Sequence, residues 1–189
     1  MIANMEGEKI KKRGLLILII GVIMLACVLF TKIKNNIYEK NNSNKIENST
    51  AQLERIQISN NEEYVKIIEQ YFKYLEQKNT TEMFKLFPKF TNISITELEQ
   101  LIKQAHNAFE SECGTNINLS YNINSGDKYN SEAITKLEEE LKKQYSNFDQ
   151  TITEVYRLKI YIKISGDSGV AERETYMYVG KIDNNWFLF

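Results

Sequence analysis

The chain has 189 residues, of which 42% are hydrophobic and 26% charged, and its formal net charge is −1 at pH 7. A charge so near zero gives no strong attraction to nucleic acid, so we expect no nucleic-acid partner. The only two cysteines are Cys27 and Cys113. Because Cys27 falls in an apolar run suited to a membrane, a disulfide between the two is not expected.

That apolar run, Gly14–Phe30, follows four basic residues between positions 9 and 13. As a helix it would be about 26 Å long, the short end of what crosses a bilayer. It also has no polar face at 3.6-residue spacing, which a helix in a soluble core would show. The sequence predicts a transmembrane helix over residues 14–31. The positive-inside rule then places residues 1–13 in the cytoplasm and the rest of the chain outside the cell membrane, as a single-pass protein.

A second interpretation of the same segment is a lipoprotein signal. The stretch Met24–Cys27 resembles a lipobox, in which Cys27 would be lipidated and acyl chains would replace the helix as the anchor. The apolar run continues through Val28–Phe30, however, where lipoproteins usually turn polar. We therefore favour the span, and both interpretations attach the protein to the outer face of the same membrane.

Residues 32–59 are rich in Asn, Lys and Ser and contain few large apolar side chains. Such a stretch buries too little to offset its ordering entropy, so it is predicted to be a stalk, with room for a short helix around Thr50–Ile58. The remaining residues, 60–189, are enough for one domain with its own core.

Four helices are predicted in this outer domain from apolar stripes at helical spacing. Ser59 and Glu62 have the spacing of a capping box for the first helix, and Thr96 and Glu99 for the third. The expected ranges are 59–77, 82–87, 96–113 and 131–145.

Strands are predicted where the apolar period changes to two, at residues 117–123 and 152–164. Ser165–Gly169 is predicted to be a turn, followed by an antiparallel strand over 170–180. Asp183 and Asn184 form a tight-turn signal that closes a last hairpin onto Trp186–Phe189. Helices first and antiparallel strands last indicate an α+β domain, with the helices packed on one face of a twisted sheet.

Three segments of the chain are similar to a known pattern: IIEQYFKYLEQKNTTEMFKLFP, TKLEEELKKQYSNFDQTITEVYRLKIYIKI and TYMYVGKIDNNWFLF. Together they resemble small membrane-anchored envelope proteins of Gram-positive bacteria whose outer domain is nuclear-transport-factor-2-like. Tyr71-Phe72, Leu86–Pro88 and the hairpin Gly180–Trp186 match that pattern. The resemblance implies a cone, in which a curved antiparallel sheet wraps round the first helix and leaves a hollow. Superfamily members include isomerases and dehydratases, ligand binders and scaffold subunits of conjugation machines, so the fold does not choose the function.

Catalytic and metal-binding patterns are weak in this sequence. His106, the only histidine, falls at the flank of an apolar stripe and is interpreted as a boundary surface residue. Cys113 lies at a predicted helix end beside Gly114, which fits a small packed residue better than a reactive thiol. There is no metal-ligand spacing and no glycine-rich phosphate loop, so no metal and no cofactor are expected.

An isomerase of this fold would need an aspartate in the hollow with a raised pKa. Asp127, Asp149, Asp167 and Asp183 instead look like loop or turn residues. The chain is therefore not expected to be an enzyme.

Aromatic side chains gather near the end of the chain, and alternation places some of them on the outer face of the sheet. Exposed apolar surface often marks a contact site, although aromatic residues at strand spacing more commonly fill a core. The candidate ligand or partner surface consists of Tyr161, Tyr176, Tyr178, Trp186 and Phe187.

The leading hypothesis is a single-pass, membrane-anchored extracytoplasmic domain that binds or interacts without catalysis. Its expected partners are the lipid bilayer, through residues 14–31, and an envelope protein or a second copy of the chain. The alternative is a scaffold subunit of a conjugation or secretion apparatus. A third hypothesis is an isomerase or dehydratase on the same fold.

Overall fold

The computed structural model describes residues 53–59 and 61–189. The predicted cytoplasmic tail, the span over 14–31, Cys27 and the stalk up to residue 52 lie outside the described residues. Within the described part, no helix combines the length and the apolar character needed to cross a bilayer.

The described residues form an α+β domain, as the sequence predicts, with four α-helices and an antiparallel sheet of five strands, one more than expected. The helices are α2 (Glu63–Glu76), α3 (Thr80–Phe84), α4 (Ile95–Cys113) and α5 (Ser131–Gln144), with a short 3-10 helix η2 (Lys89–Thr91). The strands are β1 (Leu53–Ile56), β2 (Asn118–Tyr129), β3 (Ile152–Gly166), β4 (Gly169–Ile182) and β5 (Asn185–Leu188).

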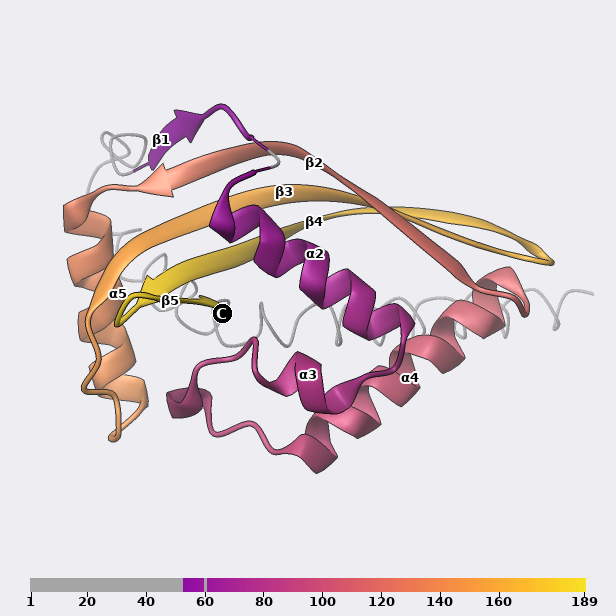
Figure 1. Cartoon of the computed structure of the whole chain (residues 1–189), viewed down its shortest axis with the longest axis horizontal. Coiled ribbons are helices and arrows are strands. Elements are labelled where there is room, and N and C mark those ends of the chain that lie inside the picture. The colour runs from indigo at the N-terminus through magenta and orange to yellow at the C-terminus, as the bar shows by residue number, and fades with distance from the viewer. Residues whose placement is uncertain (1–52, 60) are drawn as a thin grey trace, which may run out of the picture.

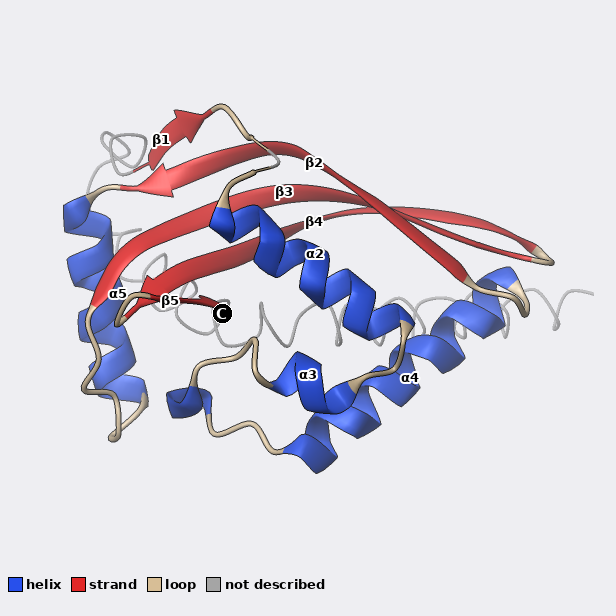
Figure 2. Cartoon of the chain, in the orientation of Figure 1, coloured by secondary structure: helices blue, strands red, loops and turns tan. Residues whose placement is uncertain are grey.

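The sheet follows chain order, β1-β2-β3-β4-β5, and each neighbouring pair is antiparallel. Its three long strands, β2, β3 and β4, curve together, and α2 lies on the concave side (Figure 1). The helices α3 and α4 lie further out on that side, and α5 stands at one end of the sheet (Figure 2).

The main core lies between the concave face and the helices α2, α3 and α4. Alternate residues of β3 contribute its sheet side, because successive side chains of a strand point to opposite faces. Among the described residues, its least exposed members include Ile68, Leu75, Leu158, Ile160 and Ile164.

A second core lies on the other face, which corrects the expectation that the helices share one face. Leu137 and Leu141 of α5 pack with Val155 and Tyr178, whose side chains point away from the concave side. Ile152 also belongs to this second core, although the sequence pattern placed it with Tyr156. A register shift between Ile152 and Glu154 is the reason, since one extra residue turns the preceding side chain to the other face.

The strand β1 was missed in the sequence. Residues 50–58 were expected to end a stalk and to suit a short helix, whereas Leu53–Ile56 pair with Gly126–Tyr129 of β2. Four residues in a polar context give no period from which a strand could be read. Their partners in β2 also lie seventy or more positions further along the chain.

Two helix starts differ from their predicted capping boxes. The residue at the N-cap of α2 is Glu62, and none of the described side chains caps that end, so the expected pairing of Ser59 with Glu62 is wrong. The capping box of α4 is formed by Ser94 and Glu97, two positions before the predicted one. Both α4 patterns fit the rule in sequence, so the pattern alone does not select between them.

His106 is buried, so its interpretation as a surface residue is wrong. Only 6% of it is exposed, and its Nε2 lies 2.7 Å from the carbonyl oxygen of Leu75, at the end of α2. Its ring also meets Phe109 edge-on, at 5.8 Å between centroids. His106 therefore joins α4 to α2 inside the main core.

Candidate ligand pocket beside the C-terminal hairpin

The hairpin of β4 and β5 has the tight turn that the sequence predicts. Asp183 and Asn184 have φ angles of 46° and 66°, in the left-handed region that Asp and Asn tolerate better than most residues. The two strands pair from Ile182 with Asn185 onward. Trp186 and Phe187, being adjacent in β5, therefore point to opposite faces of the sheet.

Trp186 points to the concave side and packs on two tyrosine rings. The rings of Tyr64 and Tyr156 stack with 4.1 Å between their centroids. The centroid of the Trp186 ring lies 6.0 Å from that of Tyr64 and 5.8 Å from that of Tyr156. The indole N–H also donates to Glu63 Oε2 at 2.8 Å. These contacts hold β5 against the first turn of α2, so the role of Trp186 in this structure is to position the hairpin.

Charged groups surround this aromatic cluster. Lys128 Nζ lies 2.9 Å from Glu154 Oε2, and the Tyr156 hydroxyl donates to the same oxygen at 2.8 Å. The hydrogen bond from Lys128 holds the pKa of Glu154 below its ordinary value. The same bond raises the pKa of Lys128. Lys181 also places its ammonium 5.5 Å from the ring centre of Trp186.

The segment between α3 and η2 lies along β5. The backbone N–H of Leu188 donates to the carbonyl oxygen of Leu86 at 2.7 Å. Further on, Phe90 packs on Tyr145 and Phe148, with ring centres 5.4 Å and 4.9 Å away. Contacts at both ends thus fix this segment beside the hairpin.

A pocket of about 450 Å³ lies between that segment and the outward side of the hairpin. This volume falls within the range of small-ligand sites in proteins. Its apolar lining consists mainly of Phe84, Phe87, Phe90, Ile182 and Phe187. Phe90 and Ile182 are buried, whereas Phe84 and Phe187 are half-buried and so form the accessible part of the wall.

Polar groups stand around this apolar lining. Lys85 is engaged with Glu82 at 2.5 Å, while Lys89 makes no ion pair with a described residue. Gln150 Oε1 is buried and has no hydrogen-bond partner among the described residues. Asp183 Oδ1 accepts from the Thr151 backbone N–H at 3.2 Å. A ligand here would contact phenyl rings, the Lys89 ammonium and the Gln150 amide oxygen.

A second depression, of about 500 Å³, lies at the connection of α2 to α3. It is more open, and its lining is mostly polar side chains, among them Lys78, Asn79 and Thr81. Because small-ligand sites are usually enclosed and mainly apolar, the phenylalanine-lined pocket is the stronger candidate.

The five predicted surface residues do not form one patch. Tyr178 is buried beneath α5, and Trp186 packs on the concave side. Tyr161 and Tyr176 lie on the outer face of the sheet, in β3 and β4. Tyr176 is 43% exposed, and the Arg157 guanidinium lies 5.1 Å from its ring centre. Of the five, only Phe187 lines the pocket.

Sequence reasoning missed Phe84 and Phe90 as site residues, and it treated Phe87 only as part of a fold pattern. The available signal was the density of phenylalanine around Pro88, three rings within seven residues. What it could not supply was the neighbour, because Phe187 is about a hundred residues further along the chain.

The four aspartates singled out in the sequence lie away from the concave core. Asp127 lies in β2 and not in a loop or turn as expected, and it pairs with Arg157 Nη2 at 2.7 Å on the outer face. Asp149, Asp167 and Asp183 lie in connections between elements and are exposed. Cys113 is buried as expected, and this burial raises the pKa of its thiol. Across residues 53–59 and 61–189, no three His, Cys, Asp or Glu side chains gather as metal ligands would.

Comparison with known proteins gives no family for this chain: no family model matches it, and no curated protein or solved structure does either. The class that the fold defines is therefore an α+β domain of helices on an open antiparallel sheet, with a phenylalanine-lined pocket beside its last hairpin.

Proposed function

We propose that this chain is a single-pass, membrane-anchored extracytoplasmic binding domain, and that the phenylalanine-lined pocket holds the apolar part of its ligand. The observation that carries the proposal is the pocket itself, about 450 Å³ with half-buried phenyl rings in its wall. Buried apolar surface contributes about 25 cal/mol per Å², so rings left partly exposed favour a ligand that covers them.

The proposal for the location rests on the sequence. The apolar run at positions 14–30, with basic residues before it, supports a membrane anchor and an outward domain. The curved sheet with α2 on its concave side supports the finer resemblance to the nuclear-transport-factor-2-like cone. On that fold, binding without catalysis suits the positions of the aspartates on the outer face and in connections.

The location is tested on the full-length chain in the cells that produce it. Alkaline extraction is expected to leave the chain in the membrane pellet, and protease added to intact cells is expected to digest the C-terminal domain. Release into the soluble fraction, or protection of the domain in intact cells, would contradict the membrane part of the proposal.

The pocket is tested with 4-fluorobenzoate, an aromatic carboxylate that combines a ring for the phenylalanine lining with a charge for Lys89. Its binding to the full-length chain in lipid nanodiscs is followed by ¹⁹F NMR. Phe187→Ala is expected to weaken binding about tenfold, because one wall of the pocket is removed. Lys89→Ala is expected to weaken it about two- to fivefold, the range of an exposed charge pair.

The matched control is Tyr176→Ala, which removes an exposed aromatic side chain from the outer face of the sheet. It is expected to leave binding unchanged. Equal losses for Phe187→Ala and Tyr176→Ala, or no saturable binding to the parent chain, would refute the pocket as the site.

A further inference from the structure

Within the described part of the chain, one edge of the sheet is open over much of its length. The strand β1 pairs only with Gly126–Tyr129, the last four residues of β2. Along the rest of β2, Asn118–Ser125, none of the described strands lies on the outer side. An edge of this kind presents alternate backbone N–H and C=O groups to which another strand can bind.

No described strand covers the free part of the opposite edge either, but its side chains differ. β5 pairs only with Val179–Ile182 of β4, and the open part of β4 includes Glu172, Arg173 and Glu174. Charges on an edge strand discourage the addition of further strands. The open part of β2 has neither a charged residue nor a proline. The two charged residues of β2, Asp127 and Lys128, both lie opposite β1.

The inward side chains of this edge are apolar. Leu119, Tyr121 and Ile123 alternate along it, and each is half-buried against the main core. The ring of Tyr121 stacks on Phe72 of α2 at 4.3 Å. An added strand would place its own alternate side chains beside this row and cover what remains exposed.

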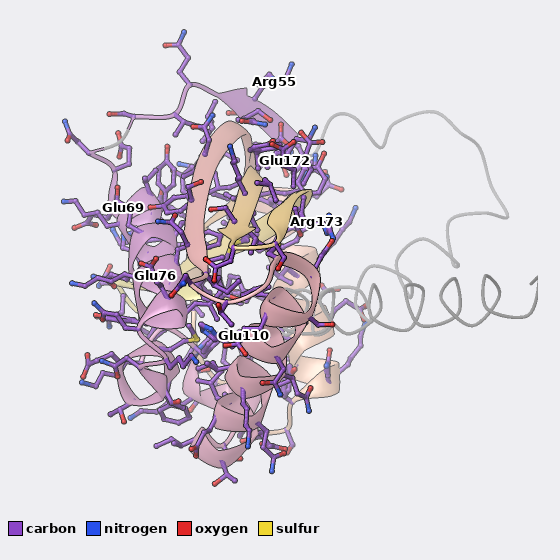
Figure 3. All side chains as sticks on the ribbon, turned by 90° about the vertical axis from the view of Figure 1, so that its right-hand side faces the viewer. Arg55, Glu69, Glu76, Glu110, Glu172 and Arg173 are labelled. Carbon is purple, nitrogen blue, oxygen red and sulfur yellow. The ribbon has the colours of Figure 1, made fainter. Side chains whose placement is uncertain are left out.

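One negative charge lies close to this row. Burial first, and then the charge of Glu69, raises the pKa of Tyr121. Glu69 and Glu76 both project from α2 (Figure 3), and Lys73 lies between them in the helix. The position beside Glu69 would favour a basic side chain in an added strand.

We propose that Asn118–Ser125 is a strand-addition site for an extended segment of a partner protein. The segment has apolar side chains at alternate positions and a basic residue beside Glu69. Strand β1 is the precedent within the chain, because four residues from a polar stretch already pair with this same edge. The site is separate from the phenylalanine-lined pocket and does not depend on it.

The probe is a capped heptapeptide, Lys-Val-Thr-Val-Lys-Val-Thr, added to the full-length chain in nanodiscs. Hydrogen–deuterium exchange is expected to slow about tenfold or more at residues 118–125, with no change at residues 170–178. Two further peptides have alternate amides methylated, one at the valines and one at the threonine and lysine positions. One of the two is expected to bind about tenfold more weakly than the other, because only one set of amides can face β2.

Variants of exposed residues distinguish this site from general stickiness. Ser120→Lys with Asn122→Lys adds charge to the β2 edge without touching the core, and is expected to weaken binding at least about fivefold. Val170→Lys makes a comparable change on the β4 edge and is expected to have no effect. Glu69→Gln is expected to weaken binding about two- to fivefold.

Three results would overturn the proposal. The first is the absence of protection at residues 118–125, or protection at 170–178 instead. The second is equal binding of both methylated peptides. The third is self-association of the chain with residues 118–125 protected before any peptide is added, which would make a second copy the occupant.

Discussion

The indole N–H of Trp186 donates to Glu63 Oε2 at 2.8 Å and so joins the last strand to the first turn of α2. Trp186 also packs on the stacked pair of Tyr64 and Tyr156. Because the next residue, Phe187, lines the pocket from the other face, this contact sets the position of the pocket wall.

Removing the Trp186 ring is therefore expected to affect both stability and the pocket. Trp186→Ala should lower the free energy of unfolding by about 2–4 kcal/mol, at or below the range for aromatic truncations because the ring is only half-buried. Glu63→Gln should lower it by at most about 1 kcal/mol, because the exposed hydrogen bond to the indole N–H is weakened and not lost. Urea denaturation followed by circular dichroism measures both, and equal effects would show that the hydrogen bond outweighs the packing.

The buried His106 provides a second stability prediction. His106→Ala removes the bond to the Leu75 carbonyl and opens a cavity between α2 and α4. We expect a loss of about 2–4 kcal/mol in thermal or urea unfolding. Asn107→Ala, at the exposed neighbouring position, is the control and should change stability by less than about 0.5 kcal/mol. If His106→Ala lowers stability as little as Asn107→Ala does, the result would contradict the buried position of His106.

The glycine opposite Phe187 in the hairpin should resist substitution. A Cβ on Gly180 would collide with the ring of Phe189. Gly180→Ala is expected to cost about 1–3 kcal/mol, as overpacking of a full core does. The nearest neighbour of a Cβ on Gly169 would be the Glu112 carbonyl oxygen, 3.9 Å away, so Gly169→Ala should be close to neutral. Unfolding curves that place the two variants together would contradict the close approach of the Phe189 ring to Gly180.

The pair of Lys128 and Glu154 predicts how stability depends on pH. The folded-state pKa of Glu154 is lowered, so its contribution is present above the unfolded-state pKa, about 4.3, and disappears as pH falls through the lower folded value. The folded-state pKa of Lys128 is raised, so its contribution is present below about pH 10.4 and disappears as pH rises through the higher folded value.

Glu154→Gln is therefore expected to flatten the stability profile at both ends. The measurement is the urea midpoint across the pH range, with Glu139→Gln on the exposed side of α5 as control. A parallel profile for Glu154→Gln and the parent chain would show that the pair adds nothing to stability.

The sequence predicted the parts of the fold that depend on local periodicity. The amphipathic stripe of α4 and the alternation of β3 belong to single segments, and both elements are confirmed. Asp183 and Asn184 likewise specify their turn by themselves, because each tolerates a positive φ.

The remaining features depend on contacts between distant segments. The place of Ile152 in the second core follows from a one-residue register shift after it, which no alternation pattern displays. The strand β1 exists because β2 offers it an edge, and the burial of His106 depends on where α2 ends. The pocket is of the same kind, since Phe84 and Phe187 meet only when the chain is folded.

The most direct test of the central claim is where an aromatic ligand contacts the domain. Intermolecular nuclear Overhauser effects between 4-fluorobenzoate and the full-length chain in nanodiscs locate that contact. We expect cross-peaks to the rings of Phe84, Phe90 and Phe187. Cross-peaks to Tyr161 and Tyr176 on the outer face, with none to these phenylalanines, would contradict this claim.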